Sequence, residues 1–336
     1  MGKSKKNVLI TGNAGFIGSK FASWLNRSHP EYHIVGVDSM TGGFRENIDP
    51  EIEQYTCDIN SSQFSEIFDS HEFEFVFHFA SYAAEGLSFY IPYHITMNNA
   101  AITDRVIAEC VKHGVGRLVF SSSMSVYGRG DRNGCVFNES DTPHPEDPYA
   151  VSKYACEMNI RNMDRHFGFD WCIVRPHNVY GPGQNIWDRY RNVLGIWTYC
   201  ALHGKTALIY GDGRQERYFS YIDDILPCIW NAAVSPAASR RTVNLGGDIG
   251  CTIAEAAETF KNVTGYGNFM HAELRDEVAV TRPSAELSRE ILGYSHTTPL
   301  TDGLKEMWRW ALTCPERERP KWERYEINKD VYTYWR

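Results

Sequence analysis

The chain has 336 residues, of which 43% are hydrophobic and 23% charged, and its formal net charge is −8. This length supports one large domain or two coupled domains. The acidic balance argues against a nucleic-acid partner, and no apolar run reaches the roughly 18 residues of a membrane span. The nine cysteines are odd in number and include no CxxC pair. This pattern is typical of reduced thiols in a cytoplasmic protein and predicts no metal site.

The first half of the chain alternates short apolar runs with helical stretches. Helices are predicted at 96–113 and about 149–167, and strands at 7–10, 33–40, 52–60, 73–81, 117–128 and 171–176. This alternation predicts an α/β fold with a doubly wound parallel sheet of the Rossmann type. We expect residues 1–180 to form the nucleotide-binding domain, with segments at about 215–247 returning to it. Residues 181–336 are expected to form mainly a smaller C-terminal substrate lobe.

A glycine-rich turn follows the first predicted strand. TGNAGFIG places Gly12, Gly15 and Gly18 between a strand and a helix, where the backbone can approach a pyrophosphate. Asp38 ends the second strand, from which a carboxylate accepts ribose hydroxyls and repels a 2′-phosphate. NAD is therefore predicted rather than NADP. Asp58, at the end of the third strand, is either a partner for the adenine amino group or a turn residue.

The stretch DTPHPEDPYAVSKYACE (141–157) places Tyr149 and Lys153 one helical turn apart. By itself this spacing is typical of a solvated helix face. In order, TGNAGFIG, the acid at 38, SSSMSVYG and YAVSK resemble the extended short-chain dehydrogenase/reductase family. Within that family the chain resembles the nucleotide-sugar epimerases and dehydratases, such as the UDP-glucose/UDP-galactose 4-epimerases. The blocks HFAS (78–81), RPHNVYGPGQ (175–184), GDGRQERYFSYIDD (211–224) and NLGG (244–247) extend the resemblance over nearly the whole chain.

The resemblance implies an acid/base role for Tyr149, with Lys153 as its partner and Ser123 on the same substrate hydroxyl. Ser121, Ser122 and Ser125 compete with Ser123 on residue type. The ammonium and a positive nicotinamide are expected to lower the pKa of the phenol toward neutrality. The implied NAD contacts are Gly12, Gly15, Phe16, Ile17, Gly18, Asp38, Ser39, Asp58, Ile59, Phe79, Ala80, Ser81, Asn99, Ser121, Tyr149, Lys153 and Pro176.

A second set of residues is implied for the nucleotide-sugar substrate. Arg217 matches an arginine that binds the diphosphate, for which a guanidinium is a natural partner. Its neighbour Tyr218 stands where the family usually shows an acid. Ser125 is expected to lie on the same side of an extended strand as Ser123. The implied substrate contacts are Ser123, Ser125, Tyr149, Asn178, Asn192, Val193, Arg217 and Arg282, with Arg275 as the alternative to Arg282.

The choice of reaction depends on residues 124 and 125. In 4,6-dehydratases that the chain resembles, an Asp and a Glu follow the strand-five hydroxyl, because expelling water needs an acid. Here these positions hold Met124 and Ser125. The sequence therefore predicts an NAD-dependent epimerase acting at C4 of a UDP-hexose, with a dehydratase or another oxidoreductase of this fold as the alternative. The resemblance also implies a homodimer built on the helices at 100–113 and around Tyr149.

Overall fold

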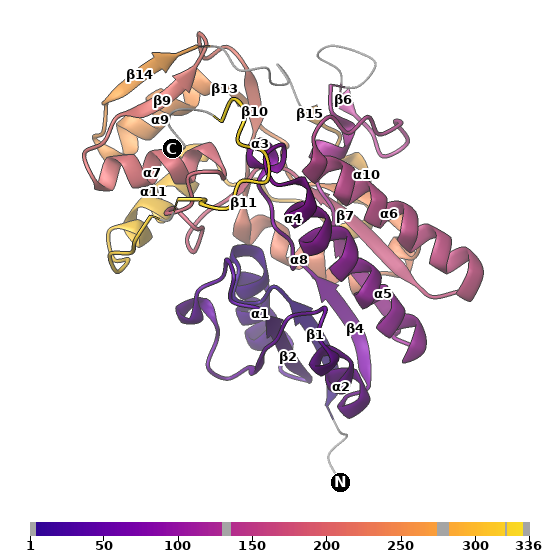
Figure 1. The fold of residues 1–336 in the computed structure, drawn as a ribbon. Helices are drawn as coiled ribbons and strands as arrows, with labels where there is room; N and C mark the ends of the chain where they lie inside the picture. The colour runs from indigo at the N-terminus through magenta and orange to yellow at the C-terminus, as the bar shows by residue number, and fades with distance from the viewer. Residues whose placement is uncertain (1–4, 130–135, 274–281, 320, 332–336) are drawn as a thin grey trace.

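A computed structural model describes residues 5–129, 136–273, 282–319 and 321–331. Within these residues, seven parallel strands form one sheet (Figure 1). They are β1 (Lys6–Thr11), β2 (Tyr32–Asp38), β3 (Glu53–Thr56), β4 (Phe73–His78), β5 (Arg117–Ser121), β7 (Trp171–Pro176) and β12 (Arg241–Leu245). The predicted doubly wound parallel sheet is confirmed.

The strand order explains where a ligand can bind. The sheet runs β12-β7-β5-β4-β1-β2-β3, so the chain winds outward from β1 to β3 and then returns to β4 beside β1. Ligands of such sheets bind at the carboxyl ends of the strands where the winding reverses. The glycine turn leaves β1 at this point. At the far edge, β12 pairs in parallel with β7, so residues 241–245 return to the sheet from the second half of the chain.

Alternate strand residues face two separate apolar layers. Val8 and Ile10 of β1 belong to one cluster, whereas Leu9 belongs to the other. The first layer is covered by α1 (Phe16–Ser28) and α8 (Ile222–Val234), and the second by α2 (Ser62–Ser70), α5 (Ile102–Lys112) and α6 (Pro148–Phe167). Both faces of the sheet are therefore buried, which accounts for its nearly continuous apolar strands.

A smaller lobe follows β7. Its parallel pair β9 (Ala207–Tyr210) and β14 (Phe269–Ala272) packs with α7 (Val193–Leu202), α9 (Ile253–Thr264) and α11 (Leu300–Ala311). Trp197 is fully buried there, against Phe260 and Phe269. Further short elements are β6 (Val136–Phe137), β8 (Val179–Tyr180), β10 (Glu216–Tyr218), β11 (Ser220–Tyr221), β13 (Gly250–Thr252), β15 (Arg282–Pro283) and α10 (Glu286–Leu292).

Two local predictions differ from the structure. The helix predicted at 96–113 begins earlier, because α4 (Pro92–Thr96), a π-helical turn (Met97–Ala101) and α5 follow one another directly. Pro92 occupies the first helical turn of α4, where its missing N–H costs nothing.

None of the described helices combines the length and apolar character that crossing a membrane requires.

The second difference concerns the predicted strand at 117–128. β5 ends at Ser121, and a 3-10 helix (Met124–Tyr127) follows. Ser123 caps this helix, its Oγ accepting the N–H of Ser125 at 3.1 Å. Serine hydroxyls compete for backbone hydrogen bonds in this way, and the competition ends the strand. The expectation that Ser125 continues an extended strand is therefore wrong.

Candidate active site

The glycine turn between β1 and α1 is a close-packed backbone cradle. Gly12 has a φ of +74°, and a Cβ there would lie 2.7 Å from the backbone nitrogen of Ala80. A Cβ on Gly18 would lie 2.2 Å from the carbonyl oxygen of Gly12. No side chain caps the N-terminus of α1 at Gly15. The amides of its first turn, which include Phe16 and Ile17, suit a pyrophosphate, so the residues present fit a dinucleotide.

Asp38 is held beside this turn at the end of β2. Its Oδ2 accepts the N–H of Ala14 at 3.0 Å, and its Oδ1 accepts the N–H of Met40 at 2.8 Å. Burial raises the pKa of the carboxyl group, and these backbone hydrogen bonds partly offset that effect. The carboxylate is therefore fixed beside the glycine turn. Ser39, the next residue, is exposed.

The remaining cofactor candidates lie either at the carboxyl ends of sheet strands or in the turn after β3. Phe79, Ala80 and Ser81 directly follow β4, and the Ala80 N–H donates to the Thr11 hydroxyl of β1. Asp58 is exposed, and its Oδ1 accepts the N–H of Asn60 at 2.8 Å, which is the turn role left open by the sequence. Ile59 beside it is buried, and Pro176 ends β7.

Tyr149 and Lys153 lie on the first turns of α6, whose N-terminus is capped by Asp147. Both are buried, with 7% of Tyr149 and 2% of Lys153 exposed. The Lys153 ammonium donates to the carbonyl oxygen of Ser121 at 2.8 Å and lies 5.9 Å from the centre of the Tyr149 ring. The buried placement excludes the solvated helix face that this spacing usually means.

The electrostatics at Tyr149 differ from the expectation. Burial raises the pKa of the phenol well above its ordinary value, and the charge of Glu85 raises it further. A hydrogen bond with Ser123 and the charge of Arg191 offset only part of this. The predicted fall toward neutrality includes the charge of a bound nicotinamide, so it stays a prediction. Burial also lowers the pKa of Lys153 to about 8.

The three consecutive serines at the end of β5, Ser121 to Ser123, are distinguished by their partners. Ser121 offers its carbonyl oxygen to Lys153, and Ser122 donates to the buried carboxylate of Glu157 at 2.6 Å. Only Ser123 has its side chain hydrogen bonded to Tyr149. The Ser125 hydroxyl donates to the Ser123 Oγ at 2.9 Å, so the two hydroxyls meet although the strand has ended.

A buried ion pair that the sequence analysis did not single out supports these serines. Glu157 of α6 accepts hydrogen bonds from Arg175 of β7 at 2.8 and 2.6 Å, and neither residue is more than 1% exposed. Because Glu157 also binds Ser122, it ties the helix of Tyr149 to the end of β5. We assign Glu157 and Arg175 a positioning role.

Asn99 has a similar role in this structure. It is buried in the π-helical turn, and its Oδ1 accepts the N–H of Tyr82 at 2.7 Å. Its Nδ2 donates to the Tyr82 carbonyl oxygen at 3.3 Å and to the Ser152 hydroxyl at 3.0 Å. The amide therefore joins the loop after β4 to α6.

The candidate diphosphate residues gather where the lobes meet. The Asn178 side chain donates to the Tyr218 carbonyl oxygen at 3.2 Å, and the charge of Arg282 acts on the Tyr218 phenol. Arg217 precedes Tyr218 on β10, and Arg282 begins β15, which contacts β10. Asn178, Arg217 and Arg282 are therefore near one another. Arg275 lies outside the described residues.

Asn192 and Val193 stand at the start of α7. Asn192 is its N-cap, with Oδ1 accepting the N–H of Leu194 at 2.9 Å and Nδ2 donating to the Val179 carbonyl oxygen at 3.4 Å. Val193 is the first residue of the helix and is partly exposed. The local structure gives Asn192 a capping role.

Charged residues from two other segments reach Tyr149. Glu85 begins the short helix α3 (Glu85–Ser88), and its charge acts on the phenol. Arg191 is coupled to the same phenol, donates to Asp188 at 2.8 Å and lies 5.6 Å from the Tyr82 ring centre. No short motif marks Glu85 or Arg191, because each comes close to Tyr149 only through the tertiary fold.

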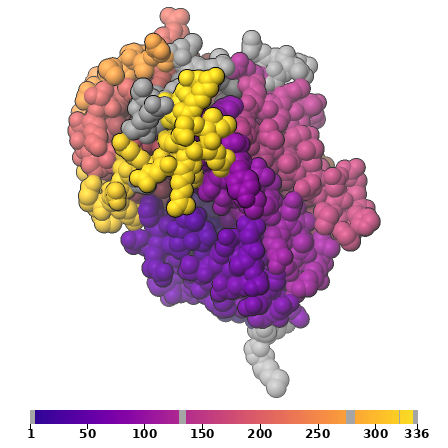
Figure 2. All heavy atoms as spheres, in the orientation of Figure 1, coloured from indigo at the N-terminus to yellow at the C-terminus, as the bar shows by residue number. Residues whose placement is uncertain are grey.

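The C-terminal segment 321–331 also packs near Tyr149. Val331 belongs to the same apolar cluster as Tyr149, and Trp322 packs on Tyr82 and His94. Glu326 accepts the N–H groups of Tyr93 and His94 at 2.7 and 2.8 Å. Figure 2 shows this segment in yellow, between the smaller lobe and the N-terminal half of the sheet domain.

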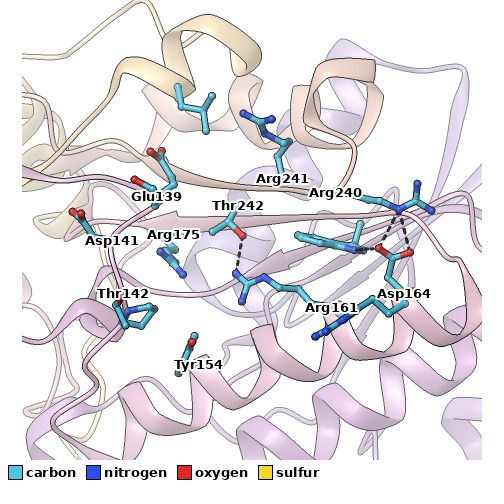
Figure 3. Close-up of a pocket in the computed structure, with 15 residues that line it drawn as sticks. Glu139, Asp141, Thr142, Tyr154, Arg161, Asp164, Arg175, Arg240, Arg241 and Thr242 are labelled. Atoms are coloured by element: carbon cyan, nitrogen blue, oxygen red, sulfur yellow. Dashed lines mark hydrogen bonds and ion pairs between the residues drawn. The ribbon is translucent and has the colours of Figure 1, made fainter.

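A surface cavity of about 750 Å³ lies elsewhere, against the C-terminal half of α6 and β12. Figure 3 shows arginines lining it, and three of them are paired with acids. Arg240 binds Asp164, and Arg161 and Arg175 both bind Glu157. None of the residues proposed for the cofactor or the substrate lines this cavity, and we do not assign it to the active site.

The comparisons with known proteins agree with this architecture. A family model described as the NAD dependent epimerase/dehydratase family matches residues 8–246. The chain therefore belongs to that family of enzymes, and NAD is its cofactor.

Individual relatives come from both branches of the family. A putative UDP-glucose 4-epimerase of Methanocaldococcus jannaschii is 28% identical, over 90% of this chain and 97% of the relative. The dTDP-D-glucose 4,6-dehydratase of Mus musculus is 26% identical, over 92% and 89%. The structure is similar to that of a UDP-glucose 4-epimerase from Thermotoga maritima solved with UDP-glucose, with a TM-score of 0.85, 28% identity and coverage of 90% and 98%.

Proposed function

We propose that this protein is an NAD-dependent epimerase that inverts C4 of a nucleotide sugar, with a UDP-hexose as substrate. The observation that supports it most is the buried pair Tyr149 and Lys153, with the Ser123 side chain hydrogen bonded to Tyr149. A phenol with a hydroxyl and an ammonium nearby can move the proton of a sugar hydroxyl.

In this proposal Tyr149 accepts the proton of the C4 hydroxyl while Ser123 hydrogen bonds to the same oxygen. Lys153 favours the phenolate by its charge. NAD, when bound, accepts the hydride from C4 and returns it. Between the two transfers the 4-keto sugar turns, so that the hydride returns to the opposite face. We propose that Asn178, Arg217 and Arg282 hold the diphosphate, whose charge suits guanidinium partners.

A second candidate is a nucleotide-sugar 4,6-dehydratase, and one observation favours it. Met124 and Ser125 supply no acid beside Ser123, but the charge of Glu85 acts on Tyr149. A carboxylic acid near the reacting sugar could protonate a leaving hydroxyl at C6. The dehydratase name of the mouse relative also keeps this candidate open.

Proton NMR separates the two candidates. The purified protein is mixed with NAD and, in separate tubes, with UDP-glucose, UDP-glucuronate, UDP-N-acetylglucosamine or GDP-mannose. The proposal predicts the anomeric signal of a C4 epimer, and Glu85→Gln should still produce it. A C6 methyl doublet that disappears in Glu85→Gln would establish the dehydratase instead. Silence in every tube would contradict both candidates for these four sugars.

We also propose that the enzyme is a homodimer. α5 and α6 pack side by side on one face of the sheet, which is where the family resemblance places the subunit contact (Figure 1). Light scattering at micromolar concentration should give twice the chain mass, and a monomeric mass would contradict the proposal.

A further inference from the structure

Two histidines and a glutamate meet at the end of the sheet opposite the glycine turn. His33 lies near the start of β2, Glu53 begins β3, and His71 directly follows α2. One possible ligand atom from each lies within 4.8 Å of the other two, the one such group of three among the described residues. These side chains remain accessible, with 40%, 34% and 15% of their surface exposed.

The surroundings of His71 fix which nitrogen faces the group. Its Nδ1 lies 3.0 Å from the carbonyl oxygen of Ile67, which can only accept a hydrogen bond. Nδ1 therefore carries a proton, and Nε2 is directed at the Glu53 Oε1, 3.4 Å away. A backbone carbonyl on the far nitrogen is the usual way in which proteins orient a metal-binding imidazole.

Glu53 is oriented from two sides. Its Oε2 lies 2.7 Å from the Nε2 of His33, and its Oε1 accepts the hydroxyl of Tyr55 at 2.5 Å. The carboxylate thus faces two imidazole nitrogens. A neutral His71 would point a lone pair at a negative oxygen, which is unfavourable unless a positive atom lies between them.

The spacing suits a tetrahedral ion. With Zn–N and Zn–O bonds of about 2.0–2.1 Å, neighbouring ligand atoms of a tetrahedron lie about 3.3 Å apart. The observed separations are 2.7 Å from the His33 Nε2 to the Glu53 Oε2 and 3.4 Å from the His71 Nε2 to the Glu53 Oε1. We propose that His33, Glu53 and His71 form a binding site for a divalent transition metal of the Zn²⁺ class, with water as the fourth ligand. Two imidazoles favour such a metal over Mg²⁺ or Ca²⁺.

The position of the site indicates what a bound ion would do. β3 is the edge strand of the sheet and pairs only with β2 among the described strands. An ion would fasten this edge strand to β2 and to the end of α2. The active site lies at the carboxyl ends of the strands, so the ion would stabilise the fold without entering the reaction. Separate segments supply the ligands, so their sequence spacing shows no metal motif.

Metal titration tests this proposal on the full-length protein. After treatment with EDTA, one equivalent of Zn²⁺ should bind in a calorimetric titration, and Co²⁺ should give the visible absorption of a four-coordinate site. His71→Ala and His33→Ala should each weaken Zn²⁺ binding about 100-fold or more, since even outer-shell changes cost 10–100-fold. Zn²⁺ should raise the Tm of the wild type and leave that of His71→Ala unchanged.

A matched control is His29→Ala. His29 also pairs with a glutamate, Glu31, at 3.3 Å, but this pair does not include a second histidine. This variant should bind Zn²⁺ like the wild type. If a histidine variant folds poorly, Glu53→Gln is used in its place, because it preserves the shape of the side chain. Equal binding in all variants, or no binding by the folded wild type, would overturn the proposal.

Discussion

The candidate site has two parts, a proposed cofactor end and a proposed catalytic end, and they are built differently. The cofactor end consists of backbone: the glycine turn and Asp38 come from residues 12–40 and are joined by hydrogen bonds to main-chain amides. The catalytic end consists of side chains around Tyr149, which come from the loop after β4, the end of β5, α6, the 188–191 loop and the C-terminal segment. A local motif can specify the first end, whereas only the complete fold assembles the second.

This difference has an electrostatic consequence. At the cofactor end, fixed main-chain amides partly offset the rise in the pKa of Asp38 that burial causes. At the catalytic end the protein alone raises the pKa of the phenol, through burial and Glu85. Tyr149 is therefore neutral in the protein alone, and formation of the phenolate requires a further positive charge nearby. The NAD nicotinamide is the charge that the proposed reaction supplies.

The largest expected effect is at the catalytic end. Tyr149→Phe should lower the epimerisation rate about 10³-fold, because general acid–base groups contribute 10²–10⁴-fold. NAD affinity, measured by fluorescence titration, should stay within about threefold of the wild type, since the change removes one hydroxyl without altering the charge of the neutral side chain. Tyr154→Phe on the same helix is the control. Equal loss in both variants would mean that the helix, not the phenol, is what matters.

At the cofactor end a single methyl group should break the cradle. Gly12→Ala should destabilise the protein by about 2–3 kcal/mol in urea unfolding, through left-handed backbone strain and contact with Ala80. NAD binding should fall with it. Gly114→Ala is the matched control, because its φ is also positive, at +63°, and nothing lies within 4 Å of the added Cβ. If both variants lose the same stability, the close approach to Ala80 contributes nothing.

The buried ammonium predicts a pH dependence of stability. Lys153 has a pKa of about 8 in the folded protein, below the ordinary value of 10.5. Between these values the unfolded chain binds more protons, so this group makes stability rise with pH. Lys153→Met should remove about 2 kcal/mol of that rise between pH 8 and 10, measured by urea unfolding. Lys112→Met, at an exposed site, should leave the slope unchanged. A wild-type slope in Lys153→Met would refute the assignment.

The smallest effect concerns the C-terminal segment. Glu326→Ala should cost about 1 kcal/mol, the typical value for losing a side-chain cap on a helix N-terminus, here α4. Because Trp322 and Val331 pack beside the site, KM for the nucleotide sugar should rise while kcat changes little. Glu323→Ala, an exposed acid of the same segment, is the control. A fall in kcat alone would place the effect on the chemical step.

The sequence indicated the sheet and the glycine turn because each depends on neighbouring residues. Gly12, Asp38, Tyr149 and Lys153 lie in short motifs with a fixed relation to a strand or helix end. The spacing of apolar residues alone did not show where β5 ends, because the Ser123 side chain caps the next helix and competes with strand hydrogen bonding. The roles of Glu85, Arg191 and Glu326 also escaped prediction. Each acts on a residue from another part of the chain, and nothing in the local sequence encodes that contact.

The central claim is that hydride leaves C4 of the sugar and returns to the same carbon. A nucleotide sugar that is turned over in the NMR screen, labelled with deuterium at C4, tests this directly. The account predicts that both C4 epimers retain deuterium at C4 and that none reaches solvent water. Deuterium found at C6 of a deoxy sugar would identify the dehydratase, and deuterium lost to water would exclude internal hydride transfer altogether.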